Sequence, residues 1–145
     1  MDEKELLSNL TLLQEQQKIL QANLEMLNLQ LSELNISKLT LEGIGKLKKG
    51  DEILIPIGAG SFVKAKLEDT ERVIVGVGAD VALSRNLEDA ISNLEKRVKD
   101  ISEKLKETQD AFLKVSQKLQ ELSQEASRIL EQRRGTGDVL GEPKA

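Results

Sequence analysis

A leucine repeat in the first third of the chain constrains the fold more than any other feature. Steps alternating between four and three residues, from Leu6 to Leu41, land on leucine at nine of eleven positions. Only Gln17 and Lys38 interrupt the series. An apolar residue repeated on average every 3.5 residues over five heptads indicates a helix that packs against another helix in a coiled coil. We call these heptad positions the seam of the helix.

Local signals set the expected limits of this first helix. Asp2 and Glu5 have the spacing of a capping box, in which the first side chain accepts a hydrogen bond from the helix start. Gly43 follows the last seam leucine and is typical of a helix stop. The sequence therefore predicts a coiled-coil helix over residues 2–43.

A second heptad pattern occupies the last third of the chain. Its seam runs from Leu87 to Ile129, and Thr108 is the one polar residue in it. Asn86 is a favourable N-cap immediately before the pattern. Gly135 follows two arginines and predicts the helix stop. We expect a helix over residues 86–134.

The two helices are expected to pack against each other as an antiparallel hairpin. Neither seam can stay exposed to water, and a compact linker joins the helices, so Leu41 is expected near Leu87. The second helix is the longer, and residues beyond about Glu125 are expected to overhang the start of the first. Residues 135–145 are expected to form a disordered tail.

The first helix carries a further set of apolar residues on the side away from its seam. In a plain two-helix coil that side is polar, so these residues indicate a contact surface. Two interpretations stay open: packing against a neighbouring helix in an oligomer, or transient binding of apolar ligands and unfolded chains. We call this set the outer row, and it consists of Leu12, Ile19, Met26, Leu29 and Ile36.

Apolar residues also gather at the start of the first helix and at the end of the second, which together form the open end of an antiparallel hairpin. Residues at that open end are the least needed to hold the hairpin together, so binding of unfolded chains is the favoured interpretation. We call them the tip set. The candidate client-binding residues are Leu6, Leu7, Leu10, Leu12, Leu13, Ile19, Ile129 and Leu130.

Residues 44–85 are expected to form a β module between the helices, because residues 53–84 change to a period of two, which is typical of β-strands. Turn signals at 58–60, 68–70 and 78–80 divide the apolar runs into four short strands, or two hairpins. The segment "IPIGAGSFVKAKL" also matches "VGVGADVALSRNL" at an offset of twenty residues, which predicts the same glycine-containing turn in both hairpins.

The hairpins are interpreted as an assembly module. Pro56 lacks an N–H group, which predicts a sheet edge or a break in pairing. Short strands bury little alone and their open edges pair with other chains, so several copies are expected to close into an intersubunit β-barrel. The predicted interface residues are Ile53, Ile55, Ile57, Val63, Ala65, Leu67, Val73, Val75, Val77, Val81 and Leu83.

Composition removes several kinds of chemistry. The chain has no His and no Cys, which excludes imidazole and thiolate metal ligands and the nucleophilic systems that need either residue. The Gly58–Gly60 segment is followed by a strand pattern and lacks a Gly-Lys-Ser/Thr sequence, so it does not fit a phosphate-binding loop. No catalytic, metal or cofactor site is expected, and an enzyme is disfavoured.

Nucleic acid and membranes are also disfavoured as partners. The net charge is −4, basic residues are interspersed with acidic ones, and the aromatic fraction is 1%. No apolar run reaches 18 residues, and the acidic start lacks a signal-peptide pattern. A cytoplasmic location is expected.

The order helix, two hairpins, helix resembles that of alpha-class prefoldin subunits. The most specific segments are "LIPIGAGSFVKAKL" and "VIVGVGADVALSRNLEDA", and the resemblance covers about residues 2 to 134. It implies a mainly α fold with a small β insert: an antiparallel coiled-coil hairpin whose helices are joined by two β-hairpins that form an intersubunit barrel. Two hairpins, where the beta class has one, point to the alpha class. A hexamer of two subunit types, with a single kind of alpha subunit, suggests an archaeal source.

The resemblance also implies a function. Two alpha subunits and four prefoldin beta subunits would form a hexamer whose coiled-coil tips hold non-native polypeptides and deliver them to a group II chaperonin without ATP. The alternative from another class is a coiled-coil scaffold or tether that docks a fixed partner helix and has no affinity for unfolded chains.

Overall fold

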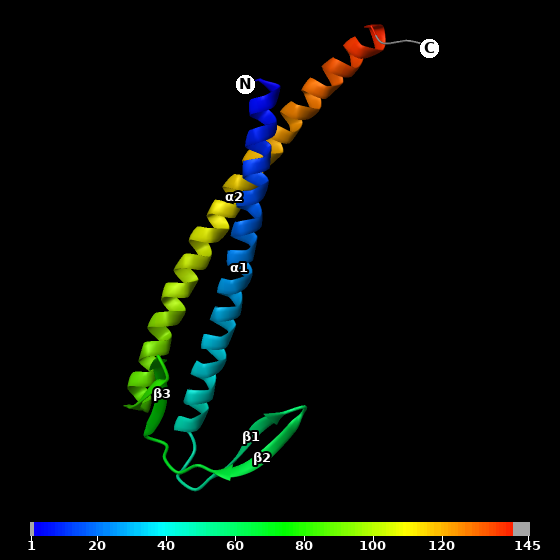
Figure 1. Cartoon of the computed structure of the whole chain (residues 1–145). Coiled ribbons are helices and arrows are strands. Elements are labelled where there is room, and N and C mark those ends of the chain that lie inside the picture. Colours follow the sequence, from blue (N-terminus) through cyan, green and yellow to red (C-terminus); the bar gives the residue numbers. More distant parts are fainter. Residues whose placement is uncertain (1, 141–145) are drawn as a thin grey trace. The chain divides into compact units, whose positions relative to one another are not determined.

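The computed structural model describes residues 2–140, and describes side chains as far as Arg134. The predicted order of helix, two hairpins and helix is confirmed (Figure 1). The chain divides into two compact units, Met1–Asn28 with Lys104–Ala145 and Leu29–Glu103, which are described separately below. The elements are α1 (Glu3–Gly45), β1 (Glu52–Gly58), β2 (Ser61–Lys66), β3 (Arg72–Gly78), β4 (Val81–Asn86) and α2 (Leu87–Leu140).

Both helices begin at the predicted N-caps. The backbone N–H of Glu5 donates to Asp2 Oδ1 at 2.7 Å. The backbone N–H of Asp89 donates to Asn86 Oδ1 at 3.1 Å. Each side chain thereby satisfies a donor that has no partner inside its helix.

Both helices extend beyond their predicted ends. α1 continues through Gly43 to Gly45, and the N–H groups of Lys46 and Leu47 close a tight final turn on carbonyls three residues earlier. α2 continues through Gly135 to Leu140 instead of stopping at residue 134. An interior glycine costs a helix only about 1 kcal/mol relative to alanine, so it does not by itself end one. Residues 141–145 of the predicted tail lie outside the described residues.

In the first unit the helices pack antiparallel through their seams. The Nη2 atom of Arg133 lies 2.7 Å from Glu3 Oε2, and Gln17 Nε2 donates to Ser116 Oγ at 3.0 Å. All seam positions of this unit are buried or half-buried, and Leu6 is only 1% exposed. The hydrophobic core of the unit is therefore the line of contact between the two helices.

The alignment of the helices differs from the expected one by about one helical turn. The start of α1 is accompanied by α2 as far as Arg133, so no overhang begins at Glu125. In the second unit, a Cβ atom placed on Gly45 would lie 3.1 Å from Leu87 Cδ2, so α1 continues one turn past Leu41 alongside the start of α2. The two extra residues at the end of α1 account for part of this shift.

The two hairpins are built alike. Each is a separate two-stranded antiparallel sheet, with Ile55 opposite Val63 in one and Val75 opposite Leu83 in the other. Each register shifts just before its turn, after Pro56 in the first hairpin and after Gly76 in the second. The break in pairing predicted at Pro56 is confirmed. Because Gly76 has the same break, the shared turn causes it and not the proline.

The turns confirm the repeat at an offset of twenty residues. Both central residues have positive φ: 50° and 75° at Ala59 and Gly60, then 51° and 60° at Ala79 and Asp80. These are the backbone angles of a type I′ turn, whose twist matches that of the strands it joins. The sequence predicted glycine at positive φ but gave no sign that the two alanines adopt it as well.

Candidate interaction surfaces

The outer row of α1 is exposed along its whole length. Its five side chains retain between 51% and 62% of their accessible surface, although every seam position of α1 is buried or half-buried. Packing α1 against α2 therefore leaves an apolar surface that the coiled coil does not use. This part of the sequence prediction is confirmed.

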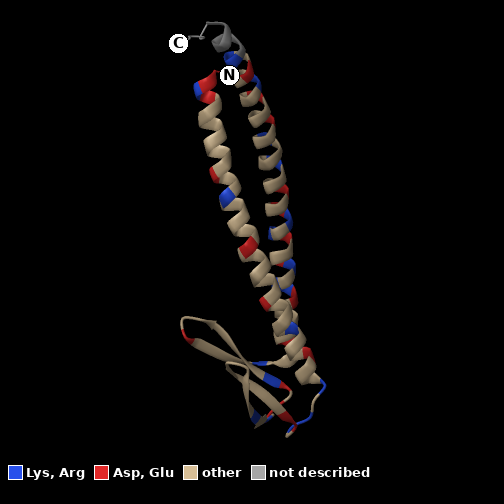
Figure 2. Ribbon diagram, turned by 90° about the vertical axis from the view of Figure 1, so that its right-hand side faces the viewer, with Lys and Arg blue, Asp and Glu red and all other residues tan. Residues whose placement is uncertain are grey.

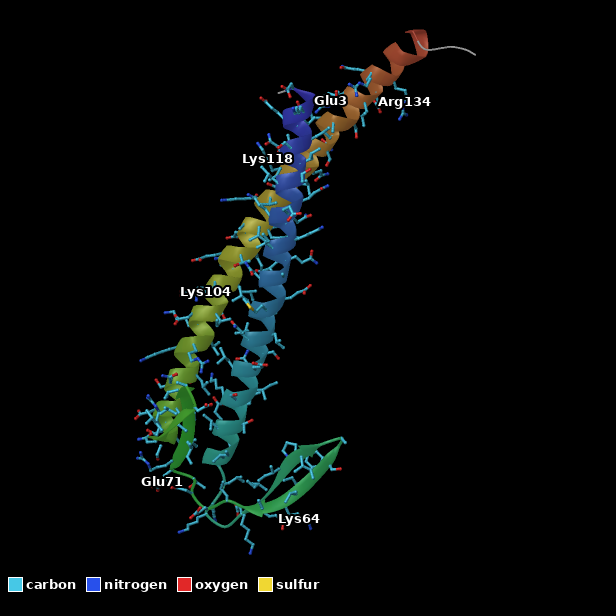
Figure 3. The ribbon with its side chains drawn as sticks, in the orientation of Figure 1. Glu3, Lys64, Glu71, Lys104, Lys118 and Arg134 are labelled. Atoms are coloured by element: carbon cyan, nitrogen blue, oxygen red, sulfur yellow. The ribbon has the colours of Figure 1, made fainter. Side chains whose placement is uncertain are left out.

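The outer side of α2 is different. Among its described side chains, the large exposed hydrophobic residues are Leu113 and Leu130, and they do not form a row. Charged residues occupy 21 of the 54 positions of α2 and only 9 of the 43 positions of α1. Figure 2 shows the charges concentrated on α2, and Figure 3 shows its long side chains, with Lys104 and Lys118 labelled. The two helices thus present unlike surfaces to solvent.

The tip set does not form one surface. Leu7, Leu12, Ile19 and Leu130 are exposed by 52% to 59%. The seam residues Leu10, Leu13 and Ile129 are half-buried. Leu6 belongs to the core, because α2 continues alongside the start of α1 and covers it. The prediction that Leu6 offers its side chain to a client does not fit this burial.

The predicted interface face of the hairpins is only partly covered. Cross-strand partners share a face, which groups the predicted residues of each hairpin together. The half-buried members are Ile53, Ala65, Leu67, Val73 and Val75. The exposed members are Ile55, Ile57, Val63, Val77, Val81 and Leu83.

The opposite face of the hairpins is also apolar in places, and the sequence analysis missed it. Leu54, Phe62 and Ile74 are 59%, 58% and 79% exposed. Leu54 pairs with Lys64 and Phe62 with Pro56, on the face away from Ile55 and Val63. The available signal was the continuous apolar runs "ILIPI" and "VIVGV", because strands covered on both faces are apolar without alternation.

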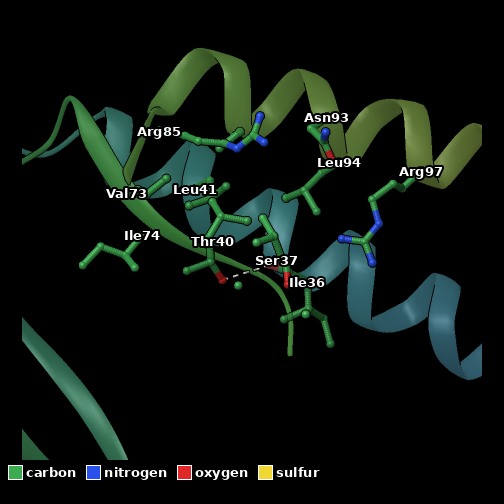
Figure 4. Close-up of a pocket in the computed structure, with 15 residues that line it drawn as sticks. Ile36, Ser37, Thr40, Leu41, Val73, Ile74, Arg85, Asn93, Leu94 and Arg97 are labelled. Atoms are coloured by element: carbon green, nitrogen blue, oxygen red, sulfur yellow. Dashed lines mark hydrogen bonds between the residues drawn. The ribbon is translucent and has the colours of Figure 1, made fainter. Parts of the chain in front are cut away.

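A groove of about 830 Å³ lies in the second unit, between β3 and the neighbouring ends of the two helices (Figure 4). Ile36, Val73, Val75 and Leu94 supply apolar walls, and Arg85 and Arg97 supply two guanidinium groups. Thr40 also lines it, with its hydroxyl donating to the Ile36 carbonyl at 2.9 Å. Ile36 is the last member of the outer row, so the row ends in this groove. Nothing in the sequence pattern indicated it.

Both polar residues that interrupt the α1 seam have partners across it. Gln17 donates to Ser116, as described above, and Lys38 Nζ lies 3.7 Å from Glu95 Oε1 and 3.8 Å from Glu42 Oε1. A polar residue at a seam position favours the one alignment in which it is satisfied. These two contacts therefore specify the helix alignment separately in each unit.

The described part of the chain contains neither a metal-binding group nor a membrane-spanning helix. No three acidic side chains among residues 2–134 come together in a way that would hold a metal ion. Neither α1 nor the described length of α2 contains a segment long and apolar enough to cross a membrane. The features that require explanation are the exposed apolar surfaces.

The architecture defines a class of protein: a two-helix coil whose helices are connected by two matched β-hairpins. The model of the prefoldin family, "Prefoldin subunit", matches residues 13–132. The chain belongs to the prefoldin family.

Its relatives are subunits of the alpha class. The chain is 40% identical to prefoldin subunit alpha of Pyrococcus horikoshii over 118 residues, covering 81% of this chain and 80% of that protein. It is 46% identical to prefoldin subunit alpha 1 of Thermococcus kodakarensis over 97 residues, covering 67% of this chain and 66% of that protein.

A solved structure has the same fold. The filamentous PFD from Methanocaldococcus jannaschii, determined by cryo-EM, matches with a TM-score of 0.67 over 81% of this chain and 98% of that one. The sequence identity is 24%, so this likeness concerns the fold alone.

Proposed function

We propose that the chain is the alpha subunit of an ATP-independent co-chaperone that holds non-native polypeptides. The observation that carries the proposal is the outer row of α1, which stays exposed after the seam has been filled. A non-native polypeptide exposes scattered apolar groups, and an exposed apolar surface on a rigid helix offers them a place to bind. Membership of the prefoldin family supports this role.

Assembly through the hairpins supports the same proposal. All four strands have a free edge in their two-stranded sheets, and both faces of the hairpins expose apolar side chains. Such strands gain stability by pairing with strands of other chains. We infer that the hairpins join two alpha and four beta subunits in an intersubunit barrel, with the coils projecting from it.

The assembly can be tested by native mass. The chain mixed with a beta-class partner is expected to give a hexamer, whereas Val75→Asp would place a charge on the shared face and leave smaller species. Ser123→Asp on α2 is the control, because it adds the same charge at an exposed position outside the hairpins. An unchanged mass for Val75→Asp would contradict the proposed barrel.

Weak contacts at several coils explain how a client is held and released. An apolar contact of about 100–200 Å² contributes only a few kcal/mol before the costs of association are subtracted. One coil is then too weak to hold a client, whereas several tethered coils bind it together. The client leaves when a few weak contacts dissociate, so delivery to a group II chaperonin needs no nucleotide hydrolysis.

A holdase assay tests the function. The assembled complex is expected to suppress aggregation of a chemically denatured model protein at stoichiometric amounts. Replacing Leu12, Ile19 and Met26 together by Ser is expected to reduce suppression several-fold and to leave the hexamer intact, whereas Leu113→Ser on α2 has little effect. A complex that assembles but does not suppress aggregation would favour the scaffold alternative.

A further inference from the structure

The outer row of α1 is part of a more regular pattern. Starting from Leu12, steps of three and four residues pass through Glu15, Ile19, Ala22 and Met26 in the first unit. In the second unit the same steps pass through Leu29, Glu33 and Ile36. All of these positions are exposed. We call this pattern the second seam, because alternating steps of three and four are the spacing of a coiled-coil contact line.

We propose that the second seam binds one further α-helix, namely a cationic amphipathic helical segment of a client polypeptide. The inference deepens the proposed function, because it names the class of client segment that this surface takes. Such a segment has apolar residues at heptad spacing and Lys or Arg at the positions that meet Glu15 and Glu33.

The spacing argues for a helical occupant. Leu12, Ile19 and Met26 are seven residues apart, so their Cα atoms recur about every 10.5 Å along α1. A helix lying alongside repeats its own seven-residue positions at the same interval. An extended strand presents residues on one face about every 6.6 Å, which does not match. The apolar contacts of the second seam are therefore in register with a helix and out of register with a strand.

The two glutamates argue for a cationic occupant. They lie within the line of contact, one in each half of it, and both are exposed. Within the part of the chain that the structure describes, no salt bridge engages either carboxylate. A bound helix that covered them would remove water from two negative charges, which requires positive side chains in return.

The same glutamates argue against a second copy of α1 as the occupant. A parallel pairing in register sets each glutamate against its own copy. An antiparallel pairing that aligns the two second seams sets Glu15 against Glu33. Both arrangements bring like charges together at the centre of the contact, which is unfavourable. The charges thus select a different helix.

The test uses the full chain and a fluorescein-labelled peptide of 21 residues. The probe has Lys at the two core positions that face the glutamates, Leu at the other core positions of each heptad, and Gln elsewhere. Its control has the same composition with Leu at alternate positions, which gives the period of a strand. Fluorescence anisotropy is expected to show that the heptad peptide binds at least about tenfold more tightly than its control, a preference of about 1.4 kcal/mol.

Charge exchange locates the site. Glu15→Lys with Glu33→Lys is expected to weaken binding of the cationic peptide about tenfold and to allow binding of a peptide with Glu in place of Lys. Glu107→Lys, at an exposed position on α2, is the matched control and is expected to change little. Circular dichroism of each variant shows that the helices are retained.

Two results would overturn the inference: equal affinity for the heptad and alternating peptides, or affinity that the charge exchange on α1 leaves unchanged. Either result is compatible with holdase activity of the assembled complex, which would then use another binding mode. If the holdase assay fails while the peptide preference and its charge dependence are observed, the proposed function is lost and the helix-binding site stands.

Discussion

The two helices are alike on the inside and unlike on the outside. Each has a seam whose positions are all buried or half-buried in the described structure. Away from the seam, α2 is densely charged, whereas α1 exposes its outer row and carries fewer than half as many charges. A coil needs only its seams, so the stability of the pair and the interaction surface of α1 are largely separate properties. One face of α1 thus packs against α2, and another face exposes an apolar row.

The largest expected effect concerns the seam. Leu27 is 8% exposed, so Leu27→Ala is expected to lower the free energy of unfolding by about 2–3 kcal/mol. Leu122→Ala, in the seam of α2, is expected to have a similar cost. Met26→Ala, at a position 51% exposed, is the matched control and is expected to stay within about 0.5 kcal/mol. Urea unfolding measures all three, and equal costs for Met26→Ala and Leu27→Ala would contradict the separation of faces.

An intermediate effect is expected at the polar interruption of the seam. Gln17→Leu completes the leucine series and is expected to raise the free energy of unfolding by about 1 kcal/mol, because apolar packing replaces a polar contact. It also removes the hydrogen bond to Ser116 that favours one alignment. Distances between spin labels on α1 and α2 are expected to become more widely distributed. A single narrow distribution in the variant would show that Gln17 does not set the alignment.

The smallest effect is expected at the ion pair between the helix ends. Glu3 and Arg133 make two contacts of 2.7 Å, but the Arg133 side chain is 65% exposed. Arg133→Ala is expected to cost no more than about 0.5 kcal/mol, and the difference should diminish in high salt. Unfolding at low and high ionic strength measures it. A loss comparable to that of Leu27→Ala would mean that charges hold the coil as strongly as the seam does.

The sequence predicted the periodic parts of this molecule well. The heptads predicted both helices and the burial of their seams, and the outer row was correctly expected to be exposed. The period of two predicted both hairpins, and the offset of twenty predicted their identical turns. In these cases each residue's environment follows from its position within a local repeat.

The alignment of the two helices could not be predicted in the same way. A leucine heptad looks almost the same after a shift of one turn, so its pattern does not say which turns of the partner helix it meets. The connection at Gly45 decides that, and it lies beyond the predicted end of α1. Leu6 stands both in the seam and in the tip set, and its burial fits the seam position, because α2 lies alongside the start of α1.

The groove and the second apolar face of the hairpins were missed for a related reason. Ile36, Val73 and Leu94 are brought together by the packing of separate elements, which no local repeat encodes. Leu54 and Ile74 lie on the face that a period of two assigns to solvent, so alternation alone does not identify them as interface residues. The continuous apolar run within each strand is the signal for this second face.

The polar contacts across the seam have a consequence for a coil that opens and closes. Gln17 meets Ser116 in one unit, and Lys38 meets Glu95 in the other. Each unit therefore has its own polar contact that specifies the register of the two helices. A segment of the coil that separates from its partner can re-form in the same register. Slippage by a turn in one unit would forfeit that unit's contact even where leucine still met leucine. A seam made only of leucine would not specify the register of the two helices in this way.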